Sequence, residues 1–224
     1  PTDKIFEDKT AGLIAAEMTL HGLVKYCKEK EAHLFPNTSI KRVDYDDKFI
    51  KLQHDTGTIK CNRAVFCAGP WTSKLFPFFA PKLSIVRQNV YYFDLHESKD
   101  ITLDGFPVWV ELGMSETDNF YGLPEFDRDG IKMAQHKLVG NDNPGLDYQM
   151  DSQLMHEFRQ KMQHRFHCKL GEMLGWENCF YSVTETEDFI IDFHPEDKRI
   201  VLGAGFSGHG FKFGPLVGEV LAKM

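Results

Sequence analysis

The stretch Arg199-Ile-Val-Leu-Gly-Ala-Gly-Phe-Ser-Gly-His-Gly-Phe-Lys-Phe213 decides the fold of this 224-residue chain. An apolar run is followed by four glycines in eight positions and then by an apolar, helix-like end. This order predicts a buried strand, a tight turn and a helix. Glycines at Gly203, Gly205, Gly208 and Gly210 either let the backbone approach a ligand closely or permit tight packing within the protein. The residues alone leave both explanations open.

Two side chains at this turn suggest a charged ligand. His209 offers an imidazole, and Lys212 offers a fixed cation at the predicted start of the helix. The N-terminus of a helix carries unpaired N–H groups and about half a positive charge, so a lysine there is unfavourable unless an anion accompanies it. The turn therefore predicts a site for an anion beside a ring system. A hydrolase is not expected, because the G-x-S-x-G pattern fails after Ser207.

Composition is that of an ordinary globular protein, with 42% hydrophobic and 26% charged residues. The net charge of −7, without a long Lys/Arg run, argues against nucleic acid and acidic membranes as partners. No apolar stretch reaches eighteen residues, and the five cysteines follow no disulfide or zinc spacing. Although His164, His167 and Cys168 share one predicted helix, nothing completes a metal site around them. We expect an intracellular protein, cytoplasmic or peroxisomal, without a metal.

Periodicity predicts an α/β (α+β) protein with two domains. In the N-terminal part, residues 18–32 predict an amphipathic helix, residues 70–73 a short helix, and strands are expected at 34–35, 39–45, 49–54, 57–60 and 63–69. From Leu83 onward, aromatic and β-branched runs predict an antiparallel or mixed sheet with strands at 85–95, 108–112, 119–123 and 130–138. A helix is expected at 151–167. Residues 1–82 and 174–224 would form one domain, and residues 83–173 an insertion.

Several residues of these elements have more than one interpretation. Lys132 lies in an apolar strand, four residues before His136, so both side chains point to the same face. An inward Lys132 would be desolvated and would lose its charge readily, whereas an edge strand would turn it toward water. Trp71, Tyr121 and Tyr181 are either core aromatics or walls of a pocket.

The C-terminal region from Cys179 to Phe213, with Val217-Gly-Glu-Val-Leu221, resembles the monomeric sarcosine oxidase family. That family of flavoenzymes includes N-methyltryptophan oxidase and peroxisomal sarcosine/pipecolate oxidase. The resemblance continues backward through Tyr121-Gly-Leu-Pro124, through Lys132 to His136 and through 67–75, Cys-Ala-Gly-Pro-Trp-Thr-Ser-Lys-Leu. It implies a fragment of an FAD-binding, glutathione-reductase-like fold. Residues 1–82 and 174–224 would belong to the FAD-binding domain, and residues 83–173 to a substrate domain with a mixed or antiparallel sheet.

The resemblance also implies roles for individual residues. FAD would be joined covalently to Cys179 through the 8α-methyl carbon of the flavin. Catalytic roles would fall to Lys132, over the flavin where oxygen is reduced, to Lys212, which binds the substrate carboxylate, and to His209 at the rim. Lys212 would also contact the cofactor. The other implied cofactor contacts are Ile40, Ala68, Gly69, Trp71, Gly205, Phe206, Gly208 and Gly210. The implied substrate pocket comprises Tyr121, His136, Tyr181, Lys212 and Trp109, the last at a position where sarcosine oxidases tend to have a smaller methionine.

The activity implied for the full-length parent is oxidation of a small secondary or N-methyl amino acid by O2 to an imine and hydrogen peroxide. The parent would act as a monomer. Because the family's G-x-G-x-x-G segment would lie upstream of Pro1, we expect this fragment alone to be inactive and to bind FAD poorly or not at all. Two alternatives stay open. One is a truncated, flavin-free relative that binds a ligand or a partner, and the other is an amadoriase-like oxidase of fructosyl amino acids.

Overall fold

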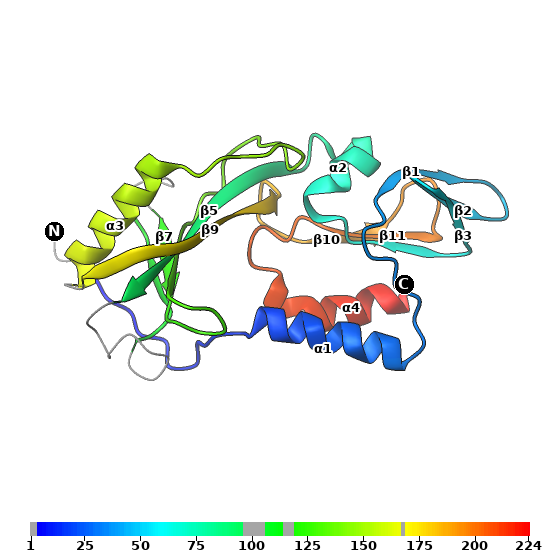
Figure 1. The fold of residues 1–224 in the computed structure, drawn as a ribbon. Coiled ribbons are helices and arrows are strands. Elements are labelled where there is room, and N and C mark those ends of the chain that lie inside the picture. The colour runs from blue at the N-terminus through cyan, green and yellow to red at the C-terminus, as the bar shows by residue number, and fades with distance from the viewer. Residues whose placement is uncertain (1–3, 96–105, 114–118, 167–168) are drawn as a thin grey trace. The chain divides into compact units, whose positions relative to one another are not determined.

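A computed structural model describes residues 4–95, 106–113, 119–166 and 169–224 (Figure 1). The chain divides into two compact units, each with its own core. The first unit comprises Pro1–Thr19, Asn89–His136 and Tyr148–Asn178. The second comprises Leu20–Gln88, Lys137–Asp147 and Cys179–Met224. The assignment of residues 83–173 to substrate and of the flanking segments to FAD stays a prediction.

The first unit is built on a sheet with the strand order β6-β7-β8-β5-β9. Its strands are β5 (Ser84–Leu95), β6 (Trp109–Glu111), β7 (Phe120–Leu123), β8 (Ile131–Gln135) and β9 (Leu170–Val183). The start of β5 and the end of β9 belong to the second unit. Strand β7 pairs antiparallel with β6 and β8, and β8 pairs antiparallel with β5. The sheet expected after Leu83 is thereby confirmed.

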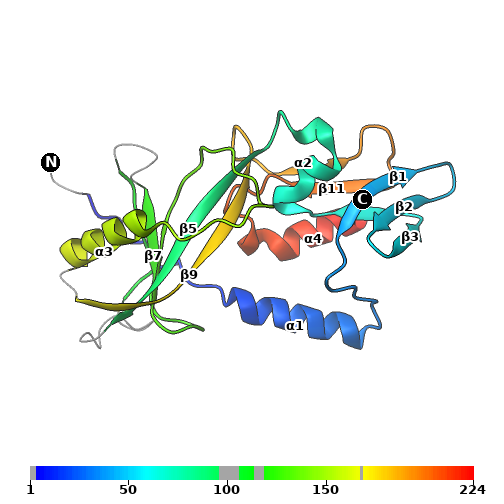
Figure 2. The same cartoon turned by 45° about the horizontal axis from the view of Figure 1, so that its top comes forward.

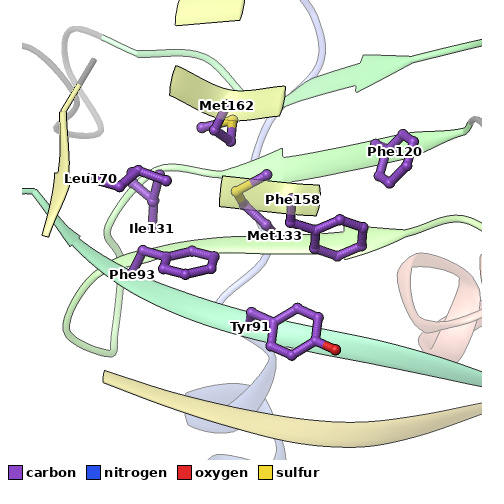
Figure 3. Packing of buried hydrophobic residues seen from close by; sticks show 8 residues of the cluster. All are labelled: Tyr91, Phe93, Phe120, Ile131, Met133, Phe158, Met162 and Leu170. Carbon is purple, nitrogen blue, oxygen red and sulfur yellow. The ribbon is translucent and has the colours of Figure 1, made fainter. Parts of the chain in front are cut away.

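Helix α3 (Ser152–Phe166) packs on one face of this sheet. The helix starts where predicted, because the carboxylate of Asp151 accepts a 2.9 Å hydrogen bond from the N–H of Leu154 and caps the first turn. Figure 3 shows its Phe158 and Met162 among buried sheet residues, namely Tyr91, Phe93, Phe120, Ile131, Met133 and Leu170. The Phe158 ring lies edge-on to the rings of Tyr91 and Phe120, with centroids 5.3 and 5.0 Å apart, an arrangement that aromatic quadrupoles favour.

The second unit contains two three-stranded sheets. One is the antiparallel meander of β1 (Ile40–Tyr45), β2 (Ile50–His54) and β3 (Gly57–Cys61), shown beside α2 in Figure 2. The other has the order β10-β11-β4, from β10 (Ile190–Phe193), β11 (Ile200–Ala204) and β4 (Ala64–Phe66). Strand β11 is buried throughout, antiparallel to β10 and parallel to β4. It is the buried strand predicted before the glycines.

Short helices follow both β4 and the glycine-rich turn. After β4 come η1 (Gly69–Trp71), α2 (Thr72–Leu75) and η2 (Pro77–Phe79). After the turn come η4 (Phe211–Phe213) and α4 (Gly214–Lys223). Helix α4 packs Val217 and Leu221 against Val201 of β11. This contact fixes the far end of the glycine-rich segment to the central strand.

The N-terminal helix differs from the other α-helices in burial. Helix α1 spans Ala16–Glu29 and has no buried residue. It ends before the predicted limit of Ala32, because Glu31 adopts a left-handed backbone with φ of 59°. The strand predicted at 34–35 is wrong, since Leu34 and Phe35 are exposed and belong to no strand. Strand β9 was not predicted.

Candidate functional site

The glycine-rich turn after β11 is shaped by contacts within the second unit. Gly205 and Gly208 have positive φ, 66° and 80°, which side chains rarely adopt. A Cβ at Gly208 would come within 2.5 Å of Cε2 of Tyr181, and one at Gly205 within 2.5 Å of Cγ2 of Thr184. These contacts support the packing explanation for both glycines. Close approach to a ligand remains a proposal.

Ser207 stabilises this turn through buried hydrogen bonds. Its side chain is fully buried, and its φ of 48° is a strained value for a residue with a Cβ. The Oγ donates a 3.1 Å hydrogen bond to the carbonyl of Gly205 and accepts a 3.3 Å bond from the N–H of Thr184. The N–H of Ser207 donates to the carbonyl of Ser182 at 3.0 Å. Ser207 therefore holds the turn against β9, a role that sequence reasoning missed because a serine gives no local signal for φ above zero.

Strand β9 carries two of the predicted residues, and one of them lies beneath the turn. Cys179 and Tyr181 are two positions apart, so their side chains lie on the same face of the strand. Tyr181 is buried under Gly208, whereas Cys179 is exposed. The structure thus brings the predicted attachment cysteine and the glycine-rich turn into one unit, with Tyr181 in direct contact with the turn.

His209 and Lys212 lie at the end of this turn, next to aromatic side chains. The His209 ring stacks on Phe189 with a centroid distance of 5.1 Å and an interplanar angle of 31°. Phe189 also meets Phe206 and Phe213, at 5.0 and 5.6 Å. Lys212 is exposed and lies in η4, two residues before α4 begins. Because η4 runs directly into α4, Lys212 lies in the first turn of this helical segment, as expected from the sequence.

Three other predicted cofactor residues line a cavity of about 480 Å³ in the second unit. Ile40, Ala68 and Trp71 line it, together with Lys74 and with Lys41, whose ammonium lies 3.4 Å from the carboxylate of Asp55. Gly69, with φ of 52°, turns the chain beside it after β4. Trp71 is 48% exposed, so the core interpretation of this residue does not hold. Apolar and aromatic walls with two cations suit a ring system that carries phosphate.

Three predicted residues share the sheet face opposite α3 in the first unit. Lys132 and Ala134 alternate on β8 with Ile131 and Met133, which belong to the core under α3. Tyr121 of β7 lies opposite Ala134, and its ring meets the His136 ring edge-on at 6.5 Å. Lys132 is half-buried. The structure therefore groups Tyr121, Lys132 and His136, in accord with the shared face expected from their spacing.

Trp109 lies on the other face of this sheet. It pairs with Gly122, which pairs in turn with Met133 of the core. A Cβ at Gly122 would come within 2.6 Å of the Trp109 ring, and Trp109 packs against the core cluster under α3. The structure does not bring Trp109 together with Tyr121 and His136, so its expected place in a common substrate pocket has no support here.

A polar cluster that sequence reasoning missed lies beside Lys132. Tyr92 of β5 pairs with Lys132, and its hydroxyl donates a 2.6 Å hydrogen bond to Glu177 of β9. The guanidinium of Arg128 lies 3.9 Å from the centre of the Tyr92 ring and 3.6 Å from the Glu177 carboxylate. Burial, and then the Glu177 carboxylate, raise the pKa of Tyr92 well above its usual range. The cluster keeps Tyr92 neutral and fixes the strand next to Lys132.

The described residues, 4–95, 106–113, 119–166 and 169–224, contain neither a candidate metal centre nor a membrane-spanning helix. Within those ranges, no group of three or more His, Cys, Asp and Glu side chains could hold a metal ion. His167 and Cys168, considered above as metal ligands, lie outside the described part of the chain. No helix in the described ranges combines the length and apolar character needed to cross a membrane.

The chain matches a known class of flavoprotein over nearly its whole length. Residues 3–224 match the model of the family described as "FAD dependent oxidoreductase". The chain belongs to this FAD-dependent oxidoreductase family. It is 29% identical to the monomeric sarcosine oxidase of Bacillus sp. (strain B-0618) over 98% of this chain and 57% of that protein. It is 27% identical to the N-methyl-L-tryptophan oxidase of Yersinia pestis (strain Pestoides F), over 97% and 58%. The predicted family is confirmed, and the chain spans less than two thirds of these relatives.

Solved structures show the same fold. The open form of NikD, an amino acid oxidase of nikkomycin biosynthesis, matches with a TM-score of 0.74 and 16% identity, over 92% of this chain and 55% of that one. Iminodiacetate oxidase from Chelativorans sp. BNC1 matches with 0.68 and 18%, over 92% and 53%. Amadoriase II from Aspergillus fumigatus matches with 0.64 and 17%, over 82% and 46%. These likenesses confirm the predicted fold class.

Proposed function

We propose that this chain is part of an FAD-dependent oxidase of small secondary or N-methyl amino acids. The observation that carries the proposal is the single unit formed by the exposed Cys179, by Tyr181 and by the turn that leads to Lys212. The names of the sarcosine and N-methyltryptophan oxidases support the substrate class. The name of the sarcosine oxidase relatives also supports a monomer.

The residues present fit FAD. The cavity lined by Ile40, Trp71, Lys41 and Lys74 offers apolar walls for a ring, and its two lysines would supply positive charge for phosphates. Cys179 is exposed, and its thiol would be the attachment point for the flavin. When bound, FAD would accept a hydride equivalent, that is two electrons with one proton, from the carbon next to the substrate nitrogen, and O2 would take up the two electrons with two protons to give hydrogen peroxide. The imine left behind would hydrolyse in water.

The chain's own residues would bind and orient the substrate and stabilise charge. Lys212 is an exposed cation next to the turn and would pair with the substrate carboxylate. His209 is held by its stack on Phe189 and would border the entrance. In the first unit, Tyr121 and His136 would contact the substrate. Lys132 would supply positive charge to oxygen as it is reduced.

The first experiment asks whether flavin is covalently bound. The polypeptide extended by its own gene to the length of the relatives is precipitated with acid, and the flavin in the pellet is measured. We expect flavin in the pellet for the unmodified protein and for Cys27→Ser, and flavin in the supernatant for Cys179→Ser. Release from all three proteins would exclude attachment at Cys179, and a protein without any flavin would favour the flavin-free alternative.

The second experiment assigns the substrate. Peroxide release is measured with sarcosine, pipecolate, N-methyltryptophan and a fructosyl amino acid as separate substrates. We expect turnover of one of the first three. Turnover of the fructosyl amino acid alone would replace our proposal with the amadoriase-like alternative. A Lys212→Met variant should raise KM for the carboxylate substrate, because it removes the cation that pairs with the carboxylate.

A further inference from the structure

Lys132 and Glu177 lie on the same face of the sheet in the first unit. Strand β5 separates β8, which carries Lys132, from β9, which carries Glu177. Tyr92 of β5 pairs with Lys132 and donates its hydroxyl to the Glu177 carboxylate at 2.6 Å, so all three side chains share the face opposite α3. Because neighbouring strands are about 4.8 Å apart, β8 and β9 are separated by about 10 Å, which a lysine and a glutamate side chain can bridge together.

The structure does not pair these two opposite charges. Among the described residues, the half-buried Lys132 has no hydrogen bond or ion pair for its ammonium. A partly buried ammonium gains free energy by pairing with a carboxylate, because the ion pair offsets hydration that the charge has lost. The Glu177 carboxylate must therefore be held by other groups.

Arg128 holds this carboxylate from the connection between β7 and β8. Its Nη1 lies 3.6 Å from Oε2 of Glu177, whereas Tyr92 donates to the other oxygen, Oε1. The guanidinium also lies 3.9 Å from the centre of the Tyr92 ring, a cation–π distance. A Cβ at Gly175, two positions before Glu177, would lie 3.0 Å from Nη2 of Arg128, so this glycine leaves room for the guanidinium on β9. Each oxygen of Glu177 thus has its own partner.

Other titratable residues share this face of the sheet. Tyr121 and His136 meet each other edge-on, and Asp94 lies two positions after Tyr92 on β5. The Asp94 carboxylate accepts a 2.8 Å hydrogen bond from the N–H of Leu95. Asp94 is therefore a second carboxylate on this face, and substitution of Glu177 alone distinguishes the two.

We infer that Arg128 is a positioning residue that holds Glu177 away from Lys132 and so leaves the Lys132 ammonium available to negative charge that develops beside it. The inference deepens the proposed function and rests on the role proposed there for Lys132 toward oxygen. A Lys132 paired with Glu177 would present a neutral pair in place of a cation. Most of its electrostatic effect on reduced oxygen would then be lost.

Chemical labelling of Lys132 tests the inference in the 224-residue chain, without flavin or turnover. Trace acetylation with acetic anhydride, followed by peptide mass spectrometry, measures how readily the Lys132 amine reacts. In Arg128→Gln, labelling of Lys132 should fall by at least about threefold, because an ammonium paired with Glu177 gives up its proton less readily. Arg128→Gln combined with Glu177→Gln should restore the original rate, and Arg128→Lys, which keeps a cation beside Glu177, should retain most of it. Lys60 on β3 should label equally in all these proteins.

The same variants in the extended, flavin-loaded protein separate this inference from the proposed function. Arg128→Gln should slow reoxidation by O2, and the added Glu177→Gln should reverse the loss. Arg42→Gln, which removes an exposed arginine paired with Asp44, is the matched control and should change neither labelling nor reoxidation. Reduced labelling with unchanged reoxidation would support the position of Arg128 and contradict the oxygen role of Lys132. Unchanged labelling of Lys132 in Arg128→Gln, or reduced labelling that Glu177→Gln does not reverse, would overturn the inference.

Discussion

The ring of Tyr181 occupies the space that a side chain at position 208 would need, since a Cβ there would lie 2.5 Å from Cε2 of the ring. Gly208 also has φ of 80°. Two costs therefore add for Gly208→Ala: about 1–2 kcal/mol for the left-handed backbone and about 1–3 kcal/mol for overpacking. We expect a loss of free energy of unfolding of about 2–5 kcal/mol, measured by urea denaturation.

Gly218 of α4 provides the matched control for this substitution. A Cβ at Gly218 meets no atom within 4 Å, and the residue lies inside a helix. Gly218→Ala should stabilise the chain by about 0.5–1 kcal/mol through helix propensity. Equal effects at the two glycines would contradict the packing of Tyr181 against the turn.

The stability of the first unit is expected to depend on the packing of Phe158 in its core. Phe158 is fully buried between the rings of Tyr91 and Phe120. Phe158→Ala should cost about 3–5 kcal/mol, because it removes buried surface and leaves a cavity. Leu216→Ala, at a residue 60% exposed on α4, should change stability by less than about 0.5 kcal/mol. A loss below that of the control would show that α3 does not pack on this sheet.

Helices and strands with a regular apolar period were predictable from the sequence, and those without one were not. Helix α3 and strand β5 were predictable because their apolar residues repeat with a helical or a strand period over many positions. Strand β9 was missed because Gly171 and Gly175, with the polar residues Glu172, Glu177 and Asn178, dilute its pattern. Its pairing with distant segments stabilises it, and periodicity cannot reveal that.

The candidate site was predictable to a different degree. Spacing placed Lys132 and His136 on one face, but it could not place Trp109, whose face depends on its register with Gly122. Nor could it find Arg128, which reaches Tyr92 and Glu177 from another part of the chain. The roles of the cysteine, of the lysines and of the turn came from the family resemblance, and they remain proposals.

The burial of His194 is expected to make the folded chain less stable in acid. Its side chain is buried against Tyr45, Phe76 and Phe78, with ring centroids 5.2–5.6 Å apart, and Nδ1 accepts a 3.2 Å hydrogen bond from the N–H of Glu196. Burial lowers the pKa of His194, and the carboxylates of Glu196 and Asp197 only partly oppose this. Below the unfolded pKa of about 6.5, the unfolded chain therefore binds the proton more readily than the folded chain.

The free energy of unfolding should accordingly fall as the pH drops through and below about 6.5. His194→Asn keeps an acceptor for the Glu196 N–H but does not titrate. We expect this variant to be less stable at pH 7.5, because ring packing is lost, and to lose less stability than the unmodified chain between pH 7.5 and pH 5. Urea denaturation at several pH values measures both quantities. An unchanged pH dependence in the variant would show that His194 does not couple folding to protonation.

The ammonium of Lys132 is expected to assist the reaction with O2 in the extended, flavin-loaded protein. It lies half-buried on β8 next to Tyr92, which the hydrogen bond to Glu177 keeps in place. If its ammonium stabilises negative charge on oxygen, Lys132→Met should slow reoxidation by O2 by about 10²–10³-fold, the range for losing one preorganised electrostatic contact. Reduction by the amino acid should change much less, because no charge develops on oxygen in that half-reaction. Stopped-flow absorbance of the flavin measures both rates, and Lys60→Met on the exposed edge of β3 is the control. Equal slowing of the two half-reactions would assign Lys132 to the structure of the sheet rather than to oxygen.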